Sequence, residues 1–353
     1  MTVLIFILVL LGLIIGHELG HFFVAKWTKM KVLEFGIGFP PKIFGKKFKE
    51  DGTEYTVNWL PLGGFVRIFG EDEKEATDPQ AFPNRPKVHH ALVLFAGPFA
   101  NILLAVVLSA TAFMVGTLAI VDPADVNNVS NPSVMVAEVV PDSPAQQAGI
   151  KPGDRILSAQ TPDEFSNLVA TSQGEVHLTV SRAGEEQEIM ITPTAGLIED
   201  DPERPAIGVA TALVGTVSYP PHVALWRAVV DTAQDFVFIL VSLVGLIGSA
   251  FTFSADVSQI AGPVGIASLT GDAAALGFGA LLSFAALLST NLAIINLLPF
   301  PALDGGRLLF LGIEVITRRR IPLNIAAAVN TAGFAVLILL MLAVTVQDVG
   351  RLL

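Results

Sequence analysis

Residues 2–16 read TVLIFILVLLGLIIG, and residues 17–21 follow as HELGH. The apolar run continues past this pentapeptide and ends where Lys26 and Lys29 appear, so it is long enough to cross a bilayer as one helix. A carboxylate at membrane depth costs several kcal/mol unless a partner pairs with it. An ionisable cluster in such a helix therefore predicts a functional site within the membrane.

The spacing inside HELGH predicts a metal site. His17 and His21 are four residues apart, so they share one face of a helix and can bind one metal ion. Glu18 lies beside the first of these ligands, where it can accept a proton from water that the metal activates. The alternative is a soluble helix whose two histidines are satisfied in a core, and the surrounding apolar run disfavours it.

The composition indicates a membrane protein. Hydrophobic residues make up 52% of the 353-residue chain, charged residues make up 15%, and the mean hydropathy is +0.64. These values lie outside the range of an ordinary soluble domain. The net charge of −11 argues against nucleic acid as a partner. Because the chain has no cysteine, histidine and carboxylate side chains would have to hold any metal.

Four apolar stretches are long enough to span a bilayer, at about residues 3–25, 91–119, 281–316 and 323–346. Lysine and arginine are concentrated between the first two stretches and at residues 318–320, whereas residues 120–222 are acidic. The positive-inside rule therefore places both basic segments in the cytoplasm, and places residues 120–222 and both chain ends outside.

A fifth apolar segment, residues 223–251, is interpreted as an interfacial or partly inserted amphipathic helix. Arg227, Asp231 and Asp235 interrupt its first half. A fifth span would also put the basic residues 318–320 on the outside, against the same rule.

The predicted fold class is an α-helical polytopic membrane protein with four spans, a membrane-associated β-hairpin region and an inserted α/β domain. The expected segments are the first span with the metal motif (1–31), the cytoplasmic-side β region (32–90), the second span (91–120), the extracytoplasmic α/β domain (131–196), a linker with interfacial helices (197–280), the third span (281–317) and the fourth span with the C-terminus (322–353).

A catalytic metal site needs a third protein ligand, and Asp304 is the candidate. It follows residues 296–303, NLLPFPAL, in which Pro299 and Pro301 exclude a regular helix. Irregular backbone at membrane depth persists only when it is buried in protein or lines a watery cavity. The lone acid and the broken helix together predict a polar interior site. The alternative is a proline kink in which Asp304 pairs with Arg307.

The extracytoplasmic segment contains SPAQQAGIKPGDRI at residues 143–156, which resembles a PDZ domain of the bacterial type. Strands are expected at residues 134–140, 155–157, 176–182 and 187–193. PDZ domains bind chain ends by adding a strand to a sheet edge, so a peptide or substrate chain end is a candidate partner. The alternative is a folded spacer that restricts access to the site.

HELGH in the first span, NLLPFPALDGG in a late span and the PDZ-like module between them resemble the site-2 protease family of intramembrane zinc metalloproteases. The bacterial sigma-factor-regulating branch, with a single PDZ domain here, is the closer resemblance. The motifs GPFAN and GPVGI extend it along nearly the whole chain. The resemblance implies that Zn²⁺ is held by His17, His21 and Asp304, that Glu18 is the catalytic residue, and that Asn296 helps to hold the substrate or an intermediate.

The resemblance also implies a multi-pass protein of the bacterial inner membrane. Its expected substrates are single-span membrane proteins, such as anti-sigma factors or remnant signal peptides, cleaved within or near their transmembrane segments. Two other classes remain open. One is a membrane-embedded PDZ scaffold that captures chain ends without cutting, and the other is a metal transporter, since intramembrane histidine and aspartate also suit an ion path.

A helical substrate must be unwound before its peptide bonds can be attacked, and a strand edge could supply replacement hydrogen bonds. Residues 54–60 alternate as a strand and residues 63–70 are interpreted as a second strand. The hypothesis is that the edge at 63–70, or its neighbour, pairs with the substrate. The expected substrate-binding residues there are Gly63, Gly64, Phe65 and Val66. Asn101 in the second span is expected either to touch substrate or to bond across helices. The alternative is a hairpin that only packs on the spans.

Overall fold

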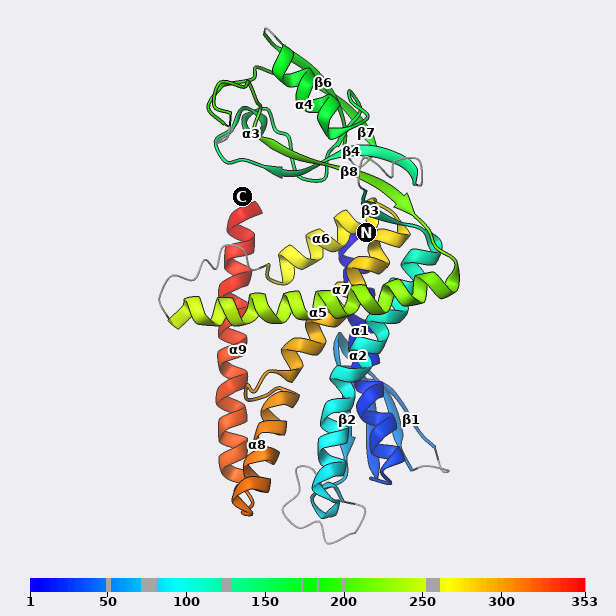
Figure 1. Cartoon of the computed structure of the whole chain (residues 1–353). Helices are drawn as coiled ribbons and strands as arrows, with labels where there is room; N and C mark the ends of the chain where they lie inside the picture. The colour runs from blue at the N-terminus through cyan, green and yellow to red at the C-terminus, as the bar shows by residue number, and fades with distance from the viewer. Residues whose placement is uncertain are drawn as a thin grey trace. The chain divides into compact units, whose positions relative to one another are not determined.

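The computed structural model describes residues 1–48, 52–70, 81–121, 129–172, 174–182, 184–197, 201–251 and 261–352. The chain divides into two compact units (Figure 1). Unit 1 comprises Met1–Thr111, Pro221–Ala274 and Leu281–Leu353, and unit 2 comprises Ala112–Pro220 and Ala275–Ala280. Unit 1 contains the long helices and a β-hairpin, whereas unit 2 contains a larger sheet with two short helices.

Five helices of the described chain are long and apolar enough to cross a membrane. They are α1 (Thr2–Trp27), α2 (Lys87–Val115), α5 (Pro221–Phe251), α7 (Phe278–Leu297) and α9 (Leu323–Leu352). Only 11% of the most apolar window of α1 and 6% of that of α9 is buried. Helices that are apolar and yet exposed to this extent require lipid around them, which agrees with a membrane protein.

The sequence predicted four spans, and the additional candidate among these five helices is α5. This helix qualifies by length and composition alone, so the interfacial position of residues 223–251 stays a prediction. Within unit 1, Figure 1 shows α5 running crosswise to α9. Two helices that cross in this way cannot both run along the bilayer normal, because spanning helices tilt by about 20° on average.

The predicted third span is interrupted. Residues 298–303 separate the end of α7 from α8 (Asp304–Thr317), which is too short to span alone. Pro299 and Pro301 lie in this break, as expected, and Ala302 adopts a left-handed backbone with φ 74°. That conformation costs a residue with a side chain roughly 1–2 kcal/mol, so contacts with the rest of unit 1 must hold the break in place.

The helix α6 (Pro263–Ala275) precedes α7 and is attached to α9 by its N-terminal end. The buried carboxylate of Asp348 on α9 accepts hydrogen bonds from the backbone amides of Gly262 and Gly265, at 3.1 and 2.8 Å. An anion at a helix N-terminus satisfies amides that have no partner inside the helix. The GPVGI motif therefore has a packing role here.

In unit 1, β1 (Val32–Lys47) pairs with β2 (Glu54–Ile68) to form a long hairpin. The chain bends so that residues 34–37 pair with residues 64–67 on one side and with residues 54–57 on the other. Among the described residues, the segment 64–67 therefore has a strand partner on one side only. Phe22 and Ala25 of α1 pack with buried side chains of the hairpin and fix this sheet against the first helix.

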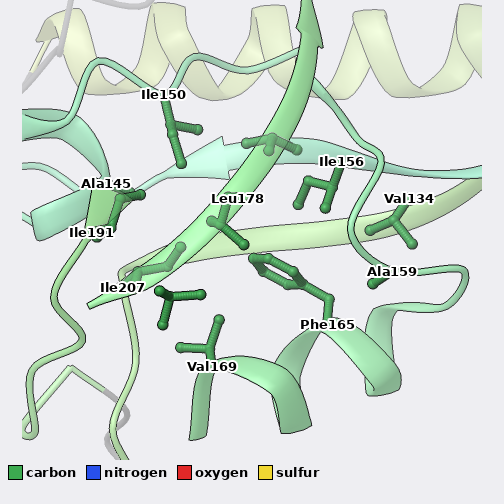
Figure 2. Packing of buried hydrophobic residues seen from close by; sticks show 12 residues of the cluster. Val134, Ala145, Ile150, Ile156, Ala159, Phe165, Val169, Leu178, Ile191 and Ile207 are labelled. Atoms are coloured by element: carbon green, nitrogen blue, oxygen red, sulfur yellow. The ribbon is translucent and has the colours of Figure 1, made fainter. Parts of the chain in front are cut away.

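Unit 2 is built on an antiparallel sheet with strand order β3-β8-β4-β5-β6-β7. The strands are β3 (Thr117–Ile120), β4 (Ser130–Val139), β5 (Arg155–Ile156), β6 (Val176–Arg182), β7 (Glu185–Ile191) and β8 (Val209–Val217), and the helices are α3 (Pro144–Gln147) and α4 (Pro162–Thr171). Figure 2 shows Phe165 and Val169 pointing from α4 toward Leu178 in the core.

The four strands expected in this unit correspond to β4, β5, β6 and β7. The unit is wider than the expected 131–196, because β8 lies beyond residue 196 and inserts between β3 and β4. The helix α4 was also not expected. Thr161 caps it by accepting a hydrogen bond from the amide of Glu164 at 3.1 Å, a signal that the sequence TPDE carries.

Candidate metal centre

The three predicted metal ligands converge, although the third lies far along the chain. His17 Nε2 is 3.1 Å from Asp304 Oδ2 and 3.1 Å from His21 Nε2. His21 Nε2 is in turn 3.2 Å from Asp304 Oδ2. The imidazoles come from successive turns of α1, and the carboxylate comes from the first residue of α8. Asp304 Oδ2 thus lies within reach of both imidazoles, as a shared metal ion would require.

The geometry of this trio fits a zinc ion. In a tetrahedral site with zinc–ligand bonds of about 2.0–2.1 Å, neighbouring ligand atoms lie roughly 3.3 Å apart. The three observed separations, 3.1 to 3.2 Å, are close to that value. Two imidazoles and one carboxylate form a donor set known from catalytic zinc sites, in which the fourth position is left for water.

The helix α2 supports the imidazoles from behind. His21 Nδ1 lies 2.7 Å from the backbone oxygen of Val93, so an Nδ1–H donates to this carbonyl and leaves Nε2 free to face the cluster. The two helices approach closely because Gly97 has no side chain. A Cβ at this position would lie 2.3 Å from His21 Nε2. Neither Val93 nor Gly97 was predicted to belong to the site.

Asn101 lies on the same helix, fully buried, with its amide nitrogen 3.3 Å from His17 Nδ1. Its backbone oxygen accepts a hydrogen bond of 2.8 Å from Ser289 Oγ on α7. Asn101 is therefore packed between helices, next to a ligand, and it is not among the residues that line the adjacent cavity. Of the two roles expected for it, the arrangement favours bonding across helices.

A cavity of about 300 Å³ opens beside the trio. Its lining includes the three ligands together with Glu18, Gly64, Phe65, Val66 and Asn296. This volume lies at the lower end of the range for ligand-binding cavities in proteins. The cavity thus joins the expected catalytic glutamate to most of the expected substrate-binding residues. Gly63 and Asn101 are not in this lining. At Gly63 the ring of Phe39 fills the space above the Cα, where an added Cβ would lie 2.3 Å from the ring.

Glu18 lies between the ligands and the outer segment of the hairpin. A Cβ added to Gly64 would be 3.0 Å from Glu18 Cγ, so the absence of a side chain at Gly64 makes room for the glutamate. The backbone of Val66 also hydrogen-bonds the Glu18 carboxylate. This backbone group belongs to the segment 64–67, and Gly64, Phe65 and Val66 of that segment line the cavity.

The helix α9 supports the break that carries Asp304. The backbone amide of Ala302 donates to Asn330 Oδ1 on α9 at 3.2 Å. The next turn of α9 has Gly333, where a Cβ would lie 2.8 Å from the backbone oxygen of Pro301. Asn330 was not predicted as a site residue. Its signal is a polar side chain in an otherwise apolar span, which is costly unless it has a partner.

Comparison with known proteins agrees with the metal site inferred from the geometry. The model of Peptidase family M50 matches residues 5–340. A candidate zinc metalloprotease of Clostridium perfringens is 35% identical over 99% of this chain and 98% of its own length. A candidate zinc metalloprotease of Nostoc is 35% identical over 100% of this chain and 97% of its own. The zinc metalloprotease RasP of Geobacillus kaustophilus is 29% identical over 99% and 98%.

Proposed function

The chain belongs to peptidase family M50 and is a zinc metalloprotease, and from this premise we propose that it cleaves peptide bonds within or near the transmembrane segments of single-span membrane proteins. One observation carries the proposal. His17, His21 and Asp304 meet, with separations of 3.1 to 3.2 Å, and both imidazoles lie on α1, one of the helices that are apolar and exposed enough to require lipid. A protease site built on such helices would meet its substrates in the membrane.

We assign the chemistry as follows. His17, His21 and Asp304 would hold the zinc ion, which when bound polarises a carbonyl and makes water acidic enough to act near neutral pH. Glu18, which lines the same cavity, accepts the proton of the attacking water and donates it to the leaving amine. Asn296 also lines this cavity, and its amide is suited to hydrogen-bond the substrate backbone.

The outer segment of the hairpin is proposed to hold the substrate in extended form. Within the described part of the chain, residues 64–67 have one strand partner, and Val66 turns its backbone toward Glu18 and the cavity. An extended peptide added to this edge would recover the backbone hydrogen bonds that it loses on unwinding. Replacing Val66 by proline should therefore reduce cleavage while zinc is retained. Normal cleavage by a correctly folded Val66→Pro variant would defeat the pairing hypothesis.

Unit 2 is proposed to be a PDZ-type domain that receives a chain end. A cavity of about 230 Å³ lies between α4 and β8, lined mainly by apolar side chains such as Phe165, Val169 and Ile207. A groove between a helix and a strand is the arrangement by which such domains add a peptide to a sheet. The alternative is a spacer that restricts access. It predicts that replacing the apolar side chains of the groove does not change the binding of a chain end.

The proposed setting is the bacterial inner membrane, with unit 2 and both chain ends on the outer side. The concentration of basic residues in the segments on the opposite side supports this orientation. Within this setting, the proposed substrates are anti-sigma factors already trimmed outside the membrane, or signal peptides left after secretion. Both have a single transmembrane segment, so they could enter the site laterally from the lipid.

The test uses the purified full-length protein in liposomes with a model single-span protein. Wild type should cleave it, a chelator should stop cleavage, and added zinc should restore it. Glu18→Gln should keep zinc and lose cleavage, whereas His17→Ala and Asp304→Ala should lose zinc. Cleavage by Glu18→Gln at the wild-type rate would refute the assigned role. A scaffold would bind chain ends without metal, and a transporter would move zinc across the liposome without cutting.

A further inference from the structure

The interior of the α1–α2 interface contains a polar side chain that the proposed chemistry does not use. Asn101 is 0% exposed, and its amide nitrogen is 3.3 Å from His17 Nδ1. Its Oδ1 is buried and has no hydrogen-bond partner among the residues that the structure describes. Burying a polar side chain is costly, so an asparagine placed beside a metal ligand in this way calls for a physical reason.

The chemistry of a ligating histidine supplies the reason. The Nε2 atom of His17 faces His21 and Asp304, and it must be unprotonated to bind a metal. The proton of the neutral imidazole then lies on Nδ1, which needs an acceptor. The amide nitrogen of Asn101 is a donor, so it cannot accept a hydrogen bond from Nδ1–H. The two ends of an asparagine amide have nearly the same shape, and their assignment follows from the hydrogen-bond network.

We infer that Asn101 is a positioning residue for zinc binding: its Oδ1 accepts a hydrogen bond from His17 Nδ1–H. This bond requires the amide to be turned, so that its oxygen takes the place of the nitrogen that lies 3.3 Å from the ring. This bond holds the tautomer and the ring orientation in which Nε2 points at the metal. The inference rests on the proposed ligand set, and it gives Asn101 no contact with the substrate.

The pattern along α2 supports this assignment. The backbone oxygen of Val93 accepts from His21 Nδ1, and Asn101 stands two turns further along the same face of the helix. Gly97, midway between them, leaves room for both rings. The ligands His17 and His21 are one turn apart on α1, so one stripe of α2 provides a polar partner for each imidazole.

The location of Asn101 also separates this role from substrate binding. Its side chain is fully buried and does not contribute to the lining of the catalytic cavity. Ser289 Oγ on α7 donates to its backbone oxygen at 2.8 Å, which fixes the helix at this point. The Ser289 bond involves the backbone of Asn101 alone, so it offers a matched control.

The experiment compares zinc binding by four full-length variants purified in detergent. Zinc per chain and the rate of zinc release to a chelator are measured for Asn101→Leu, Asn101→Asp, Ser289→Ala and His17→Ala. Loss of an outer-shell partner typically weakens metal binding roughly 10–100-fold, and that is the loss expected for Asn101→Leu. Asn101→Asp keeps an acceptor and should stay close to wild type. Ser289→Ala should lower thermal stability without changing zinc release.

A cleavage assay with zinc restored to saturation adds a second readout. A positioning role leaves the KM of Asn101→Leu for a single-span substrate at the wild-type value, whereas a substrate contact would raise it. If Asn101→Leu does not fold, Asn101→Ala takes its place with the same expectations, because it leaves a gap and introduces no clash.

The inference is overturned if Asn101→Leu releases zinc as slowly as wild type, or if Ser289→Ala loses zinc equally. It is also overturned if Asn101→Asp behaves like Asn101→Leu. The His17→Ala arm identifies a failure of the underlying ligand set. If that variant keeps wild-type zinc, the proposed site itself is wrong, whereas its loss of zinc beside an unaffected Asn101→Leu defeats the Asn101 role alone.

Discussion

Replacing Gly97 by alanine is expected to remove zinc from the protein while its helices stay folded. The added Cβ would lie 2.3 Å from His21 Nε2 and 2.7 Å from His17 Cε1. Ordinary van der Waals contact begins near 3.4 Å, so the His21 ring would have to move by about 1 Å. Functional sites tolerate departures of only about 0.5 Å from the productive geometry.

The two helices cannot easily separate to make this room. The 2.7 Å hydrogen bond from His21 to the backbone oxygen of Val93 would break if α2 moved away from α1. Gly20 packs against the same stretch of α2, where a Cβ would lie 2.3 Å from the backbone oxygen of Ala96. Either response displaces a ligand or removes its partner, so zinc affinity should fall by at least roughly 10-fold.

The assay measures zinc per chain by elemental analysis and zinc release to a chromogenic chelator, with circular dichroism to verify the helices. Gly12→Ala is the matched control, because it makes the same substitution in α1 at a position where an added Cβ meets no described atom within 4 Å beyond the adjacent backbone of its own helix. Alanine favours the helix there by about 0.5–1 kcal/mol, and zinc should be unaffected. Wild-type zinc content and release rate in Gly97→Ala would show that the close approach of α2 does not constrain the ligands.

Three further outcomes are expected. Asn330→Leu should speed zinc release, because the backbone amide of Ala302 in the break before Asp304 loses its acceptor on α9. Asn324→Leu, on an exposed turn of the same helix, should leave zinc release unchanged. Equal release rates in the two variants would refute this. Asp348→Ala should lower the unfolding free energy in detergent by about 3 kcal/mol, since two backbone amides lose a charged acceptor, and an unchanged melting temperature would contradict it. The hydrogen bond from Lys42 lowers the pKa of Glu54, so this pair stabilises the hairpin above the ordinary glutamate pKa of about 4.3 and ceases to do so as the pH falls through the lowered value. Amide exchange of the hairpin should therefore show a weaker acid dependence in Lys42→Ala, and an identical pH profile would count against the pair.

Local chemistry explains why much of the site was predictable. The spacing of His17 and His21 is a property of one helix, and it places two imidazoles on one face whatever the rest of the chain does. Pro299 and Pro301 exclude a regular helix wherever they occur, so the break before Asp304 was also expected. The apolar runs predicted helices α1, α2 and α9 because bilayer thickness sets their length.

Other features had no such local signal. The strand β8 is rich in small residues, and a long segment of sequence separates it from β7. Its insertion between β3 and β4 was therefore not expected.

The sequence alone determined which side chains could bind a metal. Ligand type, helical spacing and membrane depth are properties of short segments of the chain, so they can be inferred without knowing the fold. Only the tertiary structure decided that His17, His21 and Asp304 meet within 3.2 Å, and that α2 provides the partners behind them. The physical reason is that one partner, the oxygen of Val93, is a backbone atom that every residue possesses. Its role depends on where packing places it, and packing is a property of the whole chain.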